Sequence, residues 1–298
     1  MNQQTKGQVA VLICAILWSS SGLFIRLVDW HPIVIAGTRS FIAALFMLAL
    51  RLRRRRREKT EADPRYVWAA GFAYAATMVL FVIANKLTTS ANAILLQYSS
   101  PVWAAILGWL IAKEKPHTEH WGALAMVMAG LVVFFKDSLA AGSLMGDGIA
   151  VLSGITFGAN SVFMRMQKEG DPADSMLLAH FITALFSLPF IFMYPPELNG
   201  GSISAILFMG MVQIGAASLF FSYGIRRITA VQAMLTAVIE PVLNPVWVLL
   251  VTGEKPSLSA VIGGGIIVAA VVISSVISRR RKLQPSEGPA AQNELKKS

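Results

Sequence analysis

Hydrophobic residues occur along the chain in runs of about 20, separated by short polar breaks. A helix of that length crosses the roughly 30 Å hydrocarbon core of a bilayer. Lipid-facing β-strands would alternate apolar and polar residues in shorter segments. The pattern therefore predicts an all-α integral membrane protein with ten transmembrane helices. The predicted spans are 8–28, 32–51, 66–86, 91–112, 120–136, 146–166, 174–194, 203–225, 231–252 and 258–278.

Composition supports this class. Hydrophobic residues make up 55% of the 298 positions and charged residues only 14%, whereas soluble domains carry about 25% charged residues. The first run is too long, and too closely followed by a second, for a cleaved signal peptide, so we interpret 8–28 as a retained span. The single cysteine, Cys14, permits no internal disulfide and no metal cluster.

The distribution of basic residues predicts the orientation. If both termini are cytoplasmic, 21 of the 26 Lys and Arg residues lie in cytoplasmic segments. Such a bias is typical of the cytoplasmic side of membrane proteins. We therefore expect a multi-pass protein of a bacterial-type plasma (inner) membrane with both termini inside. The exceptions are Arg26, Lys86, Lys136 and Lys255 outside, and Arg39 within a span.

The net charge of +10 and the run RLRRRRREK at 51–59 resemble a nucleic-acid-binding pattern. Because this run lies between two predicted spans, a topology anchor that meets anionic lipid of the inner leaflet is the simpler interpretation. We therefore expect no nucleic-acid partner. The polar segment 279–298 is predicted to be a disordered, basic cytoplasmic tail.

The two halves of the sequence correspond at an offset of 140 residues. Nine identical pairs fall between 89–116 and 229–256 without a gap, including Thr89/Thr229, Pro101/Pro241 and the closing Glu-Lys-Pro of both segments. Each half therefore contains five spans. Because five is odd, the second copy must enter the bilayer from the opposite side, which predicts inverted repeats of the kind found in many transporters.

Four segments also carry a family resemblance: WSSSGLFIR (18–26), GTRSFIAAL (37–45), SSPVWAAILGWLIAKEK (99–115) and IEPVLNPVWVLLVTGEK (239–255). They resemble recurrent sequences of the EamA family in the drug/metabolite transporter superfamily. The resemblance implies two tandem five-helix repeats, 8–136 and 146–278, and transport of small metabolites or drugs. The family often carries Glu-Pro in the fourth span, where this chain has Ser100-Pro101, so the resemblance confines a carboxylate role to Glu240.

Glu240 lies near the middle of the ninth predicted span. A carboxylate facing lipid there costs about 3 kcal/mol or more, so we expect the side chain to face the interior, pair with a cation or carry a proton. A substrate-binding carboxylate and a structural one both fit. Arg39, in the second span, either snorkels to the outer interface or faces a central cavity. In the cavity it would favour an anionic substrate or pair with Glu240.

Three intramembrane prolines, Pro101, Pro241 and Pro245, remove backbone N–H groups and obstruct carbonyls four residues earlier. They predict either hinges or packing kinks. Asn244, between two of them, could cap a freed carbonyl or contact substrate.

Further polar or aromatic side chains are candidates for substrate binding. Trp18 and Ser21 lie in the first span, and Asn160 lies at the matching depth of the sixth. Small residues around them fit close helix packing, and a pocket for a partly apolar ligand fits equally. The remaining candidates are Gln97, Tyr98, His180 and Tyr223.

These observations favour a secondary transporter, expected to be an exporter, of a small metabolite such as an amino acid or of a drug-like solute. No nucleotide-binding loop occurs, which leaves proton coupling and facilitated diffusion open, and we expect no cofactor or metal. A membrane-embedded lipid-modifying enzyme needs clustered acids or histidines. His117 and His120 lie in a loop region without a second acidic cluster. A sensor or scaffold would carry a sizeable soluble domain.

Overall fold

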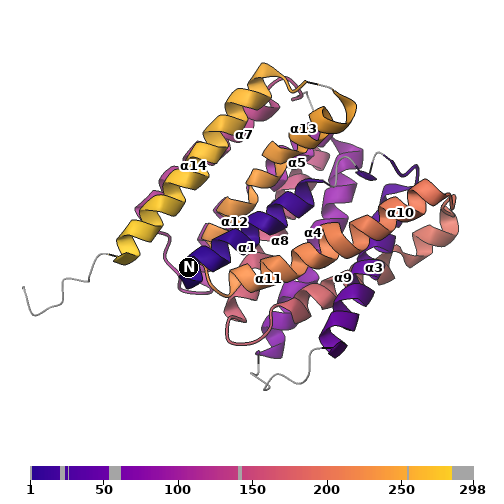
Figure 1. Ribbon diagram of the computed structural model, residues 1–298, viewed down its shortest axis with the longest axis horizontal. Coiled ribbons are helices and arrows are strands. Elements are labelled where there is room, and N and C mark those ends of the chain that lie inside the picture. Colours follow the sequence, from indigo (N-terminus) through magenta and orange to yellow (C-terminus); the bar gives the residue numbers. More distant parts are fainter. Residues whose placement is uncertain are drawn as a thin grey trace, which may run out of the picture.

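The computed structural model describes residues 2–20, 24–25, 27–53, 62–139, 143–253 and 255–283. Regular structure within these ranges is entirely helical (Figure 1). The elements are α1 (Gln3–Ser19), α3 (Pro32–Arg53), α4 (Pro64–Leu87), α5 (Ser90–Gln97), α6 (Ser100–Leu110), α7 (Thr118–Phe135), α8 (Leu144–Met166), α9 (Ala173–Met193), α10 (Gly200–Phe208), the π-helix η1 (Met209–Ala216), α11 (Ala217–Ile225), α12 (Ala230–Ala237), α13 (Ile239–Thr252) and α14 (Leu258–Leu283).

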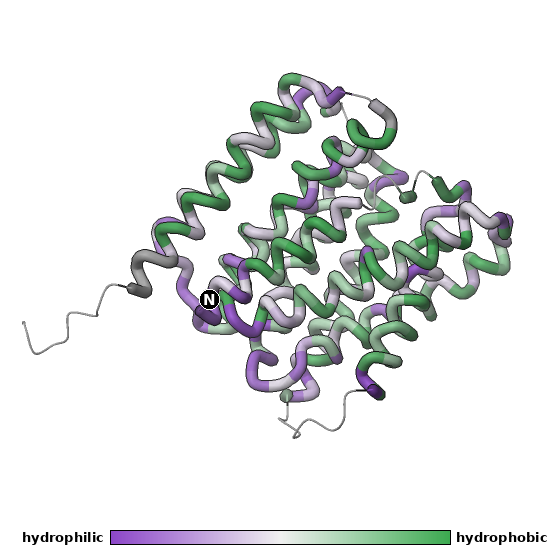
Figure 2. Tube along the Cα trace, in the orientation of Figure 1, coloured by the Kyte–Doolittle hydropathy of each residue, from purple (hydrophilic) through white to green (hydrophobic). Residues whose placement is uncertain are grey.

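Nine helical segments of the described chain are long and apolar enough to cross a membrane. The first predicted span, 8–28, is represented by α1, which has 17 residues and ends shortly before residues outside the described ranges. Apolar residues cover the lengths of the helices and polar residues gather at their ends (Figure 2). Many large apolar side chains are exposed, including Leu144 at 89% and Phe192 at 84%. Such a surface suits a hydrocarbon solvent, so this is a multi-pass membrane protein.

Three spans are less regular than the sequence predicts. The fourth divides into α5 and α6, and the ninth into α12 and α13. The eighth contains η1, eight residues of π-helix between α10 and α11, a distortion that often occurs at functional sites. The predicted disordered tail also begins later than expected, because α14 continues to Leu283. Residues 284–298 lie outside the described chain, as do residues 54–61, which include positions 54–59 of the arginine-rich run.

The two interrupted spans are built alike, as the sequence repeat implies. Thr89 caps α5 by accepting a hydrogen bond from the Asn92 N–H at 3.2 Å, and Thr229 caps α12 through the Gln232 N–H at 3.3 Å. Helix α5 then ends with Tyr98 as its C-cap, and α12 ends with Val238, the equivalent residue, as its C-cap. Each interruption lies directly before a proline, Pro101 in the fourth span and Pro241 in the ninth. Proline has no backbone N–H, so it cannot donate the next helical hydrogen bond.

In both repeats, a residue with a left-handed backbone conformation follows the interrupted span. Lys113 has φ 57° and Gly253, 140 residues later, has φ 73°. A side chain disfavours this conformation by about 1 kcal/mol, whereas glycine adopts it freely. Gly253 ends α13 as a left-handed C-cap. The backbone geometry is thus shared although the residue type is not.

Replacement of Gly253 by alanine is expected to destabilise the protein by about 1 kcal/mol, lowering Tm in detergent by about 2 °C. No atom lies within 4 Å of the added Cβ, so the loss would come from the backbone alone. Lys113→Gly is the matched control and should be neutral or stabilising. Equal Tm values for Gly253→Ala and the wild type, measured by thermal unfolding, would contradict this explanation.

Contacts between helix ends show that consecutive spans alternate in direction. On one face, the beginnings of α1, α4, α9 and α7 meet the ends of α11, α8, α3 and α14. The contacts are Gln3–Arg227 at 3.1 Å, Tyr66–Gln167 at 2.9 Å, Asp174–Arg51 at 3.1 Å and His120–Ser278 at 3.3 Å. On the opposite face, the contacts are His31–Lys86 at 2.7 Å, Thr88–Asp147 at 2.6 Å and Trp30–Glu197 at 2.8 Å.

Small residues allow the closest helix approaches. The α7–α14 pair forms one edge of the molecule (Figure 1). A Cβ placed on Gly263 of α14 would lie 2.3 Å from the backbone nitrogen of Phe134 in α7. Only glycine fits there, which is the packing expected between helices in lipid.

Candidate functional site

A cavity of about 120 Å³ lies between helices of both repeats. Helices α1, α3, α4 and α5 of the first half contribute side chains, as do α8, η1 and α13 of the second half. The cavity is therefore formed where the two halves meet. Its lining consists of Trp18, Ile25, Arg39, Tyr74, Thr77, Met78, Phe81, Gln97, Tyr98, Phe157, Gln213, Ile214 and Glu240.

Aromatic rings form one wall of this cavity. The Trp18 ring centroid lies 6.0 Å from Phe157 and 5.5 Å from Phe221, and Tyr74 lies 6.2 Å from Phe157. Trp18 and Phe157 occupy equivalent positions of the two repeats. Tilted rings at these distances attract one another and form a rigid apolar surface. The Trp18 Nε1–H is buried without a hydrogen-bond partner in the described chain, so a polar donor remains available beside the rings.

Arg39 of α3 and Glu240 of α13 bring opposite charges to the same cavity. They interact electrostatically, but the salt bridges among described residues are only Arg51–Asp174 and Arg165–Glu114. The Arg39 Nε is buried and has no hydrogen-bond partner in the described part of the chain. Space beside an unpaired guanidinium suits an anionic group, which would form charge-assisted hydrogen bonds with it.

Tyr98 lies at the interruption of the fourth span and faces Glu240 across the cavity. Its hydroxyl lies close enough to the Glu240 carboxyl for the two groups to interact. Glu240 itself lies in the first turn of α13, directly after the interruption of the ninth span. A helix amino terminus carries partial positive charge, which stabilises a nearby carboxylate. The two interrupted spans thus position this acidic group from both sides.

A chain of polar groups connects the cavity to α8. The Gln97 side-chain amide donates to Ser153 Oγ at 2.9 Å, and Ser153 Oγ donates to the Thr77 carbonyl at 3.2 Å. The Thr77 and Thr156 hydroxyls lie 2.9 Å apart. These bonds satisfy polar groups that would be costly to leave unpaired in a membrane. They also hold Gln97 in a fixed orientation at the cavity wall.

The π-helix contributes Gln213 to the cavity. Its Nε2 donates to the Trp18 carbonyl at 3.3 Å, and its Oε1 is buried without a partner among described residues. Close packing holds η1 in place, since a Cβ on Gly210 would lie 2.6 Å from Cβ of Ile42 in α3. The free amide oxygen adds an uncharged hydrogen-bond acceptor to the site, beside the Glu240 carboxyl.

The structure brings together half of the predicted substrate-binding residues. Trp18, Arg39, Gln97, Tyr98 and Glu240 line the cavity, whereas Ser21 lies outside the described residues. The other four do not line the cavity. Asn160 is fully buried in α8 with both amide atoms unpaired in the described chain, and His180 contacts Ser218 Oγ at 3.0 Å. Asn244 lies one turn beyond Glu240, and Tyr223 is 42% exposed.

The predicted hinge prolines occupy two kinds of position. Pro101 and Pro241 follow the helix interruptions in the fourth and ninth spans. Pro245 lies inside the continuous helix α13, and a further proline, Pro189, lies inside α9. Interrupted helices at membrane depth are tolerated where their backbone faces protein or a cavity. The first two prolines therefore lie where a hinge would act, beside the cavity.

Sequence reasoning missed the contribution of α4. Tyr74, Thr77, Met78 and Phe81 line the cavity, yet no residue of the third span was a candidate. Their spacing of three and four residues places them on one helix face, which was a usable signal. The span is apolar throughout, so that face is indistinguishable from lipid-facing ones. Within the described residues, no group of three His, Cys, Asp or Glu side chains could hold a metal ion.

Comparison with known proteins agrees with this architecture. Two uncharacterized transporters of Archaeoglobus fulgidus are 21% and 25% identical, covering 88% and 86% of this chain and 94% and 92% of their own lengths. The uncharacterized transporter YoaV of Bacillus subtilis is 20% identical over 93% of this chain and 99% of its own. A crystal structure with 20% identity superposes with a TM-score of 0.81 over 93% of this chain, which supports the fold.

The model of the EamA-like transporter family matches residues 5–136 and 144–276. The two matches fall on the two halves that the repeat relates, and together they cover most of the 298 residues. The family resemblance seen in the sequence is therefore confirmed. The chain is a membrane transporter with repeated halves and belongs to the EamA-like transporter family.

Proposed function

We propose that this protein is a secondary transporter, acting as an exporter, that moves a small metabolite such as an amino acid, or a drug-like solute, through the cavity lined by Arg39 and Glu240. The observation that carries the proposal is an unpaired guanidinium and a carboxylate facing one cavity between the repeats. An anionic group would bind Arg39, and an apolar part of the solute would contact the rings of Trp18 and Tyr74.

Alternating access between inverted repeats is the mechanism that we propose. The end of the fourth span and the beginning of the ninth lie at the same face, where Glu114 and Thr229 line one small cavity. The direct pairing of the second span with the seventh, and of the fifth with the tenth, also fits a two-fold relation between the halves. Inverted halves can exchange conformations and open a central site to each side in turn.

The proposed orientation places both termini in the cytoplasm. The beginning of α1 and the end of α14 lie at the same end of the molecule (Figure 1), and most basic residues of the described chain lie at this end. Reporter fusions at both termini should therefore report the cytoplasm. Fusions that place the termini on opposite sides would exclude ten crossings and with them the inverted arrangement.

The described conformation suits a cytoplasmic side that is closed. Arg165 forms an ion pair with Glu114 at 2.8 Å and donates to the carbonyls of Ile225 and Arg226 at 3.2 and 2.8 Å. These contacts tie the cytoplasmic ends of the fourth, sixth and eighth spans together. Beneath the central cavity, Val11 and Cys14 are fully buried in a packed apolar core. We therefore propose that solute reaches the cavity from the outer side in this state.

The experiment that tests the function uses purified protein in liposomes. Efflux and counterflow of amino acids, other organic anions and cationic drugs would be measured against protein-free vesicles. We expect saturable flux of at least one anionic or zwitterionic solute, and an imposed pH gradient should change its rate if protons are exchanged. Flux that never saturates for any class of solute would overturn the proposal, whereas saturable flux indifferent to pH would leave facilitated diffusion.

A further inference from the structure

A second, larger groove lies away from the central cavity, at the cytoplasmic end of α1, α3 and α11. Its volume is about 920 Å³. Its floor is apolar, with Ile13, Phe46 and Leu219 among the lining residues, and its rim carries Lys6, Arg226 and Arg227. The groove therefore combines a hydrocarbon-like channel with a cationic end.

The length of the groove suits an acyl chain. The lining extends from Ala216 at the end of η1, along α11, to Arg227, which is about 16 Å along a helix. That distance covers the greater part of one leaflet of a bilayer about 30 Å thick. Phe220 and Val9 are 37% and 38% exposed within it, so apolar side chains remain uncovered along its length.

The cations at the rim are free to bind an anion. None of Lys6, Arg226 or Arg227 forms a salt bridge with a carboxylate in the described chain, where the salt bridges are Arg51–Asp174 and Arg165–Glu114. Their rim also includes one carboxylate, Asp171, which caps the beginning of α9 through the Ala173 N–H at 3.2 Å. The rim therefore keeps an excess of two positive charges.

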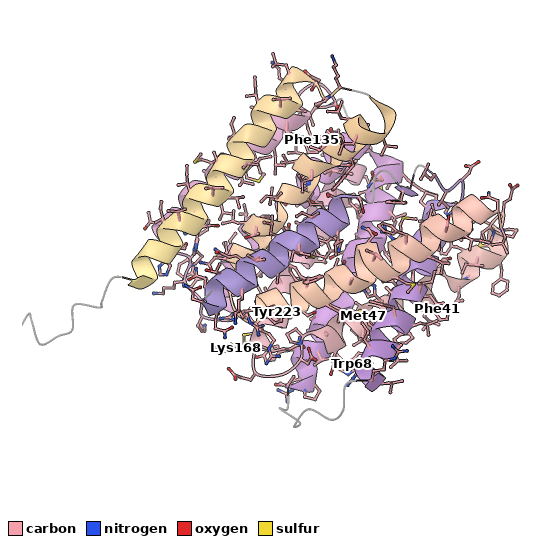
Figure 3. The ribbon with its side chains drawn as sticks, in the orientation of Figure 1. Phe41, Met47, Trp68, Phe135, Lys168 and Tyr223 are labelled. Atoms are coloured by element: carbon pink, nitrogen blue, oxygen red, sulfur yellow. The ribbon has the colours of Figure 1, made fainter. Side chains whose placement is uncertain are left out.

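Hydrogen bonds hold the guanidinium groups of Arg226 and Arg227 in position. Arg227 donates from Nε to Gln3 at 3.1 Å and from Nη1 to the Tyr223 carbonyl at 2.6 Å, and lies 3.4 Å from the Tyr223 ring centroid. Arg226 donates from Nε to the Lys168 carbonyl at 3.1 Å. Tyr223 and Lys168 lie at this same end of the molecule (Figure 3). Each guanidinium keeps further N–H donors for a ligand.

We propose that this groove binds an anionic phospholipid of the cytoplasmic leaflet. The phosphate and the charged headgroup contact Lys6, Arg226 and Arg227, and one acyl chain lies along Ile13, Phe46 and Leu219. Charge-assisted hydrogen bonds from arginine suit a phosphodiester, and basic clusters at the inner interface select anionic over zwitterionic lipids. Tyr223 lies at the depth where aromatic rings are favoured. None of the described residues of the arginine-rich run, 51–53, lines the groove.

Binding of phosphatidylglycerol to the detergent-solubilised full chain, followed by native mass spectrometry or by the rise in Tm, tests the proposal. We expect phosphatidylglycerol to bind more tightly than phosphatidylcholine with the same acyl chains. The triple variant Lys6→Gln/Arg226→Gln/Arg227→Gln should lose about 100-fold in affinity. Arg65→Gln, which changes an exposed cation outside the groove, should bind as the wild type does.

A second variant tests the apolar floor without touching the charges. Val9→Trp should fill the groove and weaken phosphatidylglycerol binding, whereas Val261→Trp on the exposed face of α14 should not. Equal binding of the two lipids, or full binding by both groove variants, would overturn the proposal and leave only general lipid contact. Equal competition by inorganic phosphate would also overturn it, in favour of a soluble anion site. These readouts do not depend on transport.

Discussion

Replacement of Arg39 by glutamine is expected to reduce transport by about 100-fold or more in liposomes, for the solute on which the wild type shows saturable flux. A buried charge that loses its partner typically costs several kcal/mol, because the remaining group stays desolvated. Here the solute's anionic group would lose the only guanidinium among the described residues that line the cavity. Arg39→Lys should retain part of the activity, since it keeps the charge but not the two-point geometry.

A matched control for this variant lies on the same helix. Arg53→Gln removes an exposed cation in the last turn of α3 and should leave flux and Tm unchanged. If Arg39→Gln folds, judged by an unchanged Tm and elution profile, yet transports as the wild type does, then Arg39 has no part in binding. A lower Tm together with a loss of flux would instead indicate a structural role for Arg39.

Glu240→Gln separates binding from coupling. The variant keeps a hydrogen-bonding group opposite Tyr98 but cannot exchange a proton. If Glu240 carries the coupling proton, the variant should still catalyse solute exchange while an imposed pH gradient no longer changes its rate. A response to the gradient equal to that of the wild type would exclude Glu240 as the coupling group.

Replacement of Arg165 by glutamine is expected to open the side of the molecule that we propose faces the cytoplasm. The variant removes the ion pair with Glu114 and the bonds to two helix-end carbonyls. The Arg165 and Glu114 side chains are only 15% and 25% exposed, so solvent replaces these bonds poorly. Hydrogen bonds to charged groups contribute about 1.5–3 kcal/mol each. We expect a shift of about tenfold or more toward states open on that side.

Chemical labelling of a buried cysteine can measure this movement. Cys14 is the single cysteine in the sequence and is fully buried beneath the central cavity. Labelling of Cys14 by a small water-soluble maleimide should be slow in the wild type and at least several-fold faster in Arg165→Gln. Cys14→Ser should abolish the signal and so identifies the labelled site.

The chain also offers a matched ion pair as control. Arg51–Asp174 lies on the same face, but its side chains are 57% and 35% exposed, and exposed pairs contribute little. Arg51→Gln should therefore leave Cys14 labelling unchanged. Equal acceleration by Arg51→Gln, or none by Arg165→Gln in folded protein, would show that the Arg165 contacts do not keep this side closed. Their equivalents in the other repeat, Arg26 and Glu254, lie outside the described residues.

The candidate site was predictable only in part. Glu240 and Arg39 were candidates because an ionised side chain in hydrocarbon needs a special environment, and both line the cavity. Asn160, His180 and Tyr223 met a similar criterion but lie elsewhere. His180 contacts Ser218 of another helix, a role that polar groups inside membrane proteins often have. Tyr74 and Thr77 were missed because nothing in an apolar helix identifies the face that turns inward.

The sequence by itself determined that the protein lies in a membrane, that it is helical, that it has two related halves and which family it belongs to. Length, composition and repetition are properties of the chain alone. Only the tertiary structure decided which helix faces meet, where the fourth, eighth and ninth spans become irregular, and which charges share a cavity. Those features depend on rotation and packing of one helix against another. In a membrane, that packing rests on close contact between small residues rather than on a hydrophobic pattern visible in the sequence.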